Sequence, residues 1–235
     1  MIGSWIVILA ISASMHCTAQ GETTLLPPPN PEDTISRGPY TLIFKCNDPS
    51  FSPITRQRMI DAFFIVYPKE ADRFNRNTLR QVVFFIDPDY KGVAETGNGV
   101  ARYNPEWLRS HPEDIDVVTH EVMHIVQDYH HHNPGWLTEG IADYVRYIFG
   151  VNNSKGAWRL PDYRPGQNYR NAYRITARFL VWAEQNKAPT LVDQLDTALR
   201  NGSYTPSIWT KLTGKSVDAL WEEYSNNPAV KLTYQ

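Results

Sequence analysis

The chain has 235 residues, of which 42% are apolar and 20% are charged, and its formal net charge is −2. This composition can supply a substantial buried core and excludes wholesale disorder. The near-neutral charge gives no basic field that would hold nucleic acid or anionic lipid, so we expect neither as a partner.

The first segment of the chain predicts export. Residues 2–13 form an apolar run that is too short to span a bilayer comfortably. Small side chains follow and end at Ala19, which is typical of a signal-peptide cleavage site. No Lys or Arg precedes the run, so an uncleaved anchor is the open alternative. We expect a signal peptide over residues 1–19 and a secreted, extracellular, monomeric product without membrane association.

The following segments combine one helix with several strands. Residues 20–37 contain a proline run and predict an exposed leader, and a single domain is expected over 38–225 with a tail at 226–235. Helical spacing of apolar residues predicts a helix over 53–67. Alternation and β-prone composition predict strands over 40–47, 81–86 and 100–103, the last as a short edge strand.

The second half of the chain reads as helical. Helices are predicted from Pro112 or Asp114 to Tyr129 and over 136–149, 169–185, 190–199 and 217–224. Strands followed by helices indicate an α+β fold, with a small mixed or antiparallel sheet and its helix first and a helical part after it.

Three side chains carry smaller expectations. Cys46 lies in the first predicted strand and has no partner once Cys17 leaves with the signal, so we expect a buried, inert thiol. Asn152 and Asn201 stand in glycosylation sequons, which matter only if the host cell is eukaryotic.

The strongest chemical signal is His120-Glu121-Val122-Met123-His124. Histidines four residues apart project from the same face of a helix, so their ring nitrogens can converge on one metal ion. Glu121 can then reach a water held by that metal and act as its base. Catalytic zinc sites need a third protein ligand as well.

The segment after the motif offers two carboxylates for that role. Glu139 begins the next predicted helix, and Asp143 lies one turn later on the same face. Their neighbours in the sequence include the apolar residues Trp136, Leu137 and Ile141. Burying carboxylates among apolar side chains is costly without a cation. A ligating histidine usually donates its second ring N–H to a carboxylate. We expect Glu139 to bind zinc and Asp143 to orient a histidine, with the reverse assignment left open.

These residues resemble the basic secretory protein family of secreted zinc metallopeptidases. The likeness lies in the His-Glu-x-x-His-x-x-Gln motif that ends at Gln127 and in Pro-Gly-Trp-Leu-Thr-Glu-Gly-Ile-Ala-Asp-Tyr-Val-Arg over 134–146. Two further stretches, 173–180 and 212–221, also resemble the family, and the likeness covers residues 40–224. That family is similar at its active site to thermolysin-like gluzincins, in which a glutamate is the third ligand. This chain departs from the family's name in being slightly acidic.

The resemblance implies a zinc metalloendopeptidase of the gluzincin type, in which Glu121 activates water and then passes its proton to the leaving amine. A further donor must stabilise the oxyanion, and we expect Tyr173, with Tyr169 as the second choice. The strand Val100–Tyr103 could pair with an extended peptide substrate.

Two other functions stay open. The chain could be a secreted defence or interaction protein that keeps the metal site with little proteolysis, or a zinc amidase acting on cell-wall peptides. Of the remaining polar side chains, Gln127 either orients a metal ligand or lies on a plain polar face. The histidines at 130–132 are expected only to complement the C-terminal end of the helix.

Overall fold

The computed structural model describes residues 31–130 and 134–234. The expected signal peptide, most of the expected leader and two of the three histidines at 130–132 lie outside the described residues. Within the described ranges, no helix is long and apolar enough to cross a membrane.

Five strands form one mixed sheet in the order β1-β2-β3-β5-β4. They are β1 (Glu32–Arg37), β2 (Tyr40–Cys46), β3 (Gln81–Ile86), β4 (Ala94–Gly97) and β5 (Val100–Tyr103). The three central strands run parallel, and β1 and β4 pair antiparallel to them at the two edges. Cys46 is buried at the end of β2, as expected, and burial raises the pKa of its thiol.

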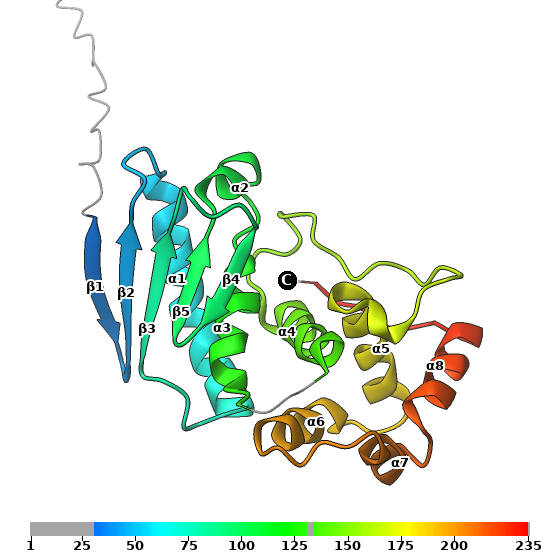
Figure 1. Cartoon of the computed structure of the whole chain (residues 1–235). Helices are drawn as coiled ribbons and strands as arrows, with labels where there is room; N and C mark the ends of the chain where they lie inside the picture. The colour runs from blue at the N-terminus through cyan, green and yellow to red at the C-terminus, as the bar shows by residue number, and fades with distance from the viewer. Residues whose placement is uncertain (1–30, 131–133, 235) are drawn as a thin grey trace, which may run out of the picture.

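Helix α1 (Pro53–Arg73) makes the crossover that the parallel pair β2–β3 requires. It begins where the Ser52 side chain accepts a hydrogen bond from the backbone N–H of Thr55, with Pro53 at the first helical position. Its apolar side packs on the sheet, and the Phe63 and Phe84 rings meet edge to face with centroids 5.5 Å apart. Helix and sheet therefore share one core (Figure 1).

The rest of the described chain is helical, which confirms the α+β class. The helices are α2 (Pro105–Ser110), α3 (Val117–Gln127), α4 (Gly135–Phe149), α5 (Tyr173–Asn186), α6 (Leu191–Arg200), α7 (Ser207–Thr213) and α8 (Val217–Asn226), with a 3-10 turn η1 at Tyr169–Asn171. Helix α3 packs against α1, β4 and β5 on one side and against α4 on the other. It therefore joins the sheet to the helical part (Figure 1).

The prediction that the third strand forms a sheet edge is wrong. β5 pairs with β3 on one side and with β4 on the other, so β4 forms the edge on that side of the sheet. The missed strand β4 is only four residues long, and its sequence Ala-Glu-Thr-Gly has little β-propensity. Its pairing with β5 creates the strand, which local sequence alone does not predict.

Helix α3 begins at Val117, later than the predicted start at Pro112 or Asp114. The acidic side chains before it make tertiary contacts instead of capping the helix. Asp114 accepts a hydrogen bond from Trp107 and pairs with Arg146. Asp116 accepts from the backbone N–H groups of residues 151 and 152. These contacts hold the segment outside the helix.

The ends of the expected domain also take part in the fold. The last residues of the expected leader form β1, which pairs with β2 through its backbone although its side chains are mostly exposed. The expected tail lies on the helical part, where the hydroxyls of Tyr147 and Tyr234 accept hydrogen bonds from the backbone N–H groups of Thr233 and Leu160. Described residues on both sides of 38–225 therefore contact the folded part of the chain.

Candidate metal centre

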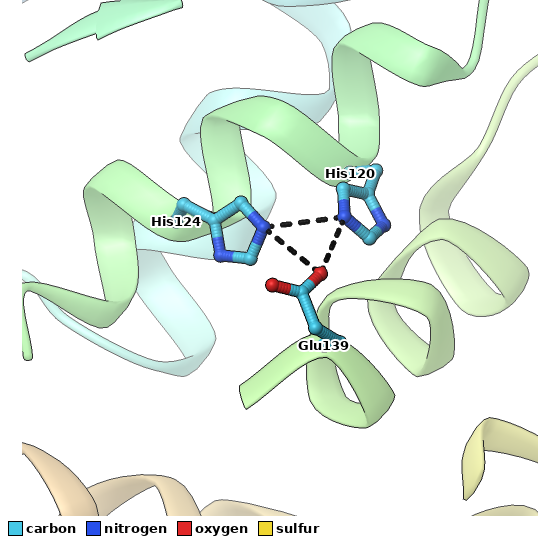
Figure 2. A group of neighbouring side chains, drawn as sticks. All are labelled: His120, His124 and Glu139. Atoms are coloured by element: carbon cyan, nitrogen blue, oxygen red, sulfur yellow. Dashed lines mark hydrogen bonds and ion pairs between the residues drawn. The ribbon is translucent and has the colours of Figure 1, made fainter. Parts of the chain in front are cut away.

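Helix α3 brings its two histidines together. The opposite side of the helix is anchored in the core by Val118, Val122 and Val126, which are fully buried. The four-residue spacing then places His120 and His124 on the face toward α4, with their Nε2 atoms 3.2 Å apart. Both rings therefore direct a nitrogen to the same point (Figure 2).

The third donor comes from the N-terminal half of α4, just after its first turn. Glu139 Oε2 lies 3.2 Å from Nε2 of His120 and 3.5 Å from Nε2 of His124. Ligands about 2.0–2.1 Å from a tetrahedral zinc ion lie about 3.3 Å from one another. The distances between the three donor atoms match this spacing in a structure that holds no metal (Figure 2). Two imidazoles and one carboxylate are also a donor set that zinc accepts.

Asp143 lies behind the first histidine and takes no place in the donor triangle. Its Oδ1 is 2.8 Å from Nδ1 of His120, the nitrogen that faces away from Glu139. A carboxylate there accepts the Nδ1–H and leaves Nε2 as the lone-pair donor. The geometry therefore supports Glu139, and not Asp143, as the third metal-binding residue.

Gln127 does the same for the second histidine. Its Oε1 lies 2.7 Å from Nδ1 of His124, and its Nε2 donates to the backbone carbonyl of Thr138, one residue before Glu139. The side chain is buried, so a plain polar face does not describe it. One amide thus orients a histidine of α3 and ties it to the start of α4.

The electrostatics of the cluster favour a cation. Burial alone would lower the pKa of His120, but Asp143, Glu139 and Glu121 outweigh it and raise that pKa to about 10. Burial would raise the pKa of Glu139, yet hydrogen bonds and charge from the two histidines hold it far below its usual range. The carboxylates thus surround a position that accepts positive charge.

The expected base, Glu121, contacts the sheet beside the histidine pair. Its Oε2 accepts a hydrogen bond of 2.7 Å from the hydroxyl of Thr96 on β4, and its side chain lines the same cavity as the histidines. Thr96 belongs to the strand that sequence reasoning missed. A lone threonine in a short polar stretch gives no signal from which its role could be inferred.

Tyr173 lies at the mouth of this site, whereas Tyr169 does not. The Tyr173 ring is nearly parallel to that of His120, with centroids 6.1 Å apart, and 54% of the residue is exposed. The charge of Glu139, followed by burial, raises the pKa of its hydroxyl, which therefore stays protonated as a donor. Tyr169 is buried and donates to Asp218 at 2.7 Å, so the second choice is wrong.

Residues 51–224 match the sequence pattern of the BSP family, described as "peptidase of plants and bacteria". The chain belongs to this family. The expected resemblance to basic secretory proteins is thereby confirmed over most of the predicted range. A comparison with curated proteins finds no match.

Among solved structures, this BSP-family chain is distantly similar to M1 zinc metallopeptidases. One is a two-domain enzyme bound to L-tryptophan, with 16% identity and a TM-score of 0.44 over 83% of this chain and 47% of that one. Another, from Deinococcus radiodurans, has 14% identity and a TM-score of 0.42 over 84% of this chain and 47% of that one. The chain spans about half the length of each.

The BSP-family site opens into a cavity of about 1050 Å³. Beyond the three residues of the donor triangle, its lining includes Trp107, Asp114, Arg146 and Trp158. These four are linked, because Asp114 accepts from Trp107 Nε1 at 2.8 Å and pairs with Arg146, whose guanidinium lies 4.6 Å from the Trp158 ring centroid. None of these four side chains was expected at the site from the sequence.

Proposed function

We propose that this chain is a secreted, zinc-dependent endopeptidase of the gluzincin type, with His120, His124 and Glu139 as the zinc ligands. The observation that carries the proposal is the donor triangle of two imidazoles and a carboxylate, with Glu121 beside it in one open cavity. Membership of a peptidase family supports peptide bonds as the substrate. Export rests on the sequence of residues 1–19 alone.

Zinc, when bound, supplies a Lewis acid that polarises the scissile carbonyl and lowers the pKa of water. The protein supplies the proton transfers. Glu121 accepts a proton from the attacking water and delivers it to the departing amine. Thr96 donates to Oε2 of Glu121 and so fixes the carboxylate, which leaves Oε1 to take the proton. Tyr173 donates its hydroxyl to the carbonyl oxygen as negative charge develops there.

The free edge of β4 is the surface on which an extended peptide would pair. Val93, Ala94, Glu95 and Thr96 line the cavity, whereas β5, the strand first expected to pair with substrate, is covered on both sides. A peptide that forms backbone hydrogen bonds with β4 would lie across the cavity, with its scissile bond beside Glu121. A peptide complex in which the backbone pairs with another element would contradict this assignment.

The decisive experiment compares the purified protein with Glu121→Gln. We expect one zinc per chain in both proteins, and cleavage of casein or gelatin by the wild type alone, because the amide cannot accept the proton. A chelator should abolish cleavage and added zinc should restore it. Zinc binding without turnover on varied peptides would instead favour the defence or interaction protein, and N-terminal sequencing of protein from the culture medium tests export.

A further inference from the structure

One wall of the cavity lies beyond the donor triangle and is a connected group of side chains. Its members, here called the indole wall, are Trp107, Asp114, Arg146 and Trp158. Val117, which lies one turn before His120 on α3, also lines the cavity. The cavity therefore continues from the histidines toward the start of α3, where a bound molecule would meet the indole wall.

Contacts within the fold hold both indoles in place. Trp107 donates its Nε1–H to Asp114 at 2.8 Å, and its ring stacks on that of His111 with centroids 3.9 Å apart. The centroid of the Trp158 ring lies 4.6 Å from the guanidinium carbon of Arg146. Because both rings are held without a ligand, the wall is pre-organised to receive one.

The polar part of the indole wall carries no net charge. Oδ1 of Asp114 pairs with Arg146, and Oδ2 accepts the hydrogen bond from Trp107. Both carboxylate oxygens are thus engaged, and the guanidinium beside them would repel a cationic side chain. An acidic side chain would be repelled in turn by Asp114, whose charge offsets that of Arg146. The wall therefore favours a neutral side chain.

The position of the indole wall favours a long side chain. Arg146 lies seven residues after Glu139 on the same face of α4, which is about 10 Å along the helix axis. A side chain next to the scissile carbonyl has to extend along α4 to touch the wall, and that of alanine or serine is too short. A long, neutral side chain that can stack on an indole is aromatic.

We propose that the indole wall is a subsite for an aromatic side chain, and that the protein cuts peptides next to phenylalanine, tyrosine or tryptophan. The inference rests on the proposed peptidase function and names its substrate class. Trp158 is the specificity-determining residue that offers the clearest test. Changing Trp107 would also remove the hydrogen bond that holds Asp114, whereas Trp158 contacts the polar pair through its ring.

A matched series of peptides tests the substrate class. The peptides differ only at the two residues that flank the scissile bond, where phenylalanine, tyrosine, leucine, alanine, glutamate or lysine is placed in turn. We expect kcat/KM to be at least about ten-fold higher with an aromatic residue at one of these positions than with any of the others. Equal values across the series, or a preference for leucine, glutamate or lysine, would overturn the proposal.

Variants of the wall test the residue. Trp158→Leu should bring the ratio of kcat/KM for the phenylalanine and alanine peptides close to one, whereas Trp158→Phe keeps an aromatic face and should keep most of the ratio. Both substrates are measured with the same enzyme, so a general loss of activity does not change the ratio. The matched control is Trp136→Leu, because Trp136 is also partly buried but stacks on Trp209 outside the cavity. An unchanged ratio in Trp158→Leu, or the same loss in the control, would overturn the role of Trp158.

Binding without turnover separates this inference from the proposed function. Calorimetry with Glu121→Gln should give a Kd about ten-fold lower for the phenylalanine peptide than for the alanine peptide, and adding Trp158→Leu should remove the difference. If the wild type cleaves no peptide but this difference is found, the peptidase function fails and the subsite stands. If the wild type cleaves peptides and the two Kd values are equal, the subsite fails and the peptidase function stands.

Discussion

At the scale of single residues, the proposed function divides the side chains of the site into those that would hold the metal and those that would act on the substrate. His120, His124 and Glu139 form the donor triangle, and Asp143 and Gln127 each fix one histidine from behind. Glu121 and Tyr173 line the same cavity without belonging to the triangle. Substitutions among the residues expected to hold the metal should therefore change zinc affinity, whereas substitutions at Glu121 or Tyr173 should change turnover.

Metal binding distinguishes the two carboxylates of α4. Glu139→Ala removes one of three donors and should abolish tight zinc binding, whereas Asp143→Ala should weaken it only about 10–100-fold because the ligands remain. Competition with a chromophoric chelator measures both affinities. The opposite ranking would make Asp143 the ligand.

Tyr173→Phe tests the oxyanion donor. Removing one such donor typically lowers kcat about 100-fold or more. The ring stays in place and the residue is 54% exposed, so we expect zinc content and melting temperature to match the wild type. Steady-state kinetics on a peptide substrate measures the effect, and an unchanged kcat would remove Tyr173 from the mechanism.

At the scale of elements, the metal site depends on how closely α4 approaches α5. A Cβ on Gly140, the residue after Glu139, would lie 2.2 Å from Cγ2 and 2.6 Å from Cβ of Thr176. Thr176 is fully buried, so it has no open space into which it could move. Glycine is required here by contact between the helices, and not by backbone conformation.

Gly140→Ala should therefore destabilise the fold by about 1–3 kcal/mol through overpacking and should displace Glu139 from the histidines. Gly135→Ala is the matched control, because a Cβ at this position in the same helix meets nothing within 4 Å. Denaturant unfolding of both variants gives the comparison. Equal free energies of unfolding for the two variants would mean that α4 and α5 can move apart without loss of stability.

The elements also show what the sequence can predict. The strands at 81–86 and 100–103 and the helix α4 were predicted within a residue, because their apolar patterns and flanking Gly or Pro residues are strong local signals. β4 and the short helices α2 and α7 were missed because tertiary pairing and packing create them. The predicted helix over 169–185 is interrupted because Ala172 and Tyr173 adopt positive φ angles of 62° and 49°. The same interruption directs Tyr173 to the site.

At the scale of the whole molecule, the core contains charged groups that couple stability to pH. Asp196 on α6 is fully buried, accepts hydrogen bonds from Tyr129 and Arg200, and ties α6 to the end of α3. Burial raises its pKa from 3.8 to about 6 against the effect of those two partners. The folded state therefore binds this proton more tightly than the unfolded state does.

The sign of the pH dependence follows. The contribution of Asp196 to stability is fully present below pH 3.8 and is lost as pH rises through about 6. Compared with Asp196→Asn, the wild type should lose unfolding free energy over this range. Denaturant unfolding of both proteins at a series of pH values measures the difference, and a constant or rising difference would contradict the prediction.

The ligand set has a consequence for how such proteins diverge. His120, His124 and Glu139 lie within twenty residues of chain on two consecutive helices, whereas Thr96 and Tyr173 come from segments before and after them. A single substitution at either outlying position leaves the donor triangle intact. Under the proposed function, a lineage with this architecture can thus lose turnover in one mutational step while it keeps its donor triangle, its fold and a cavity open to new ligands.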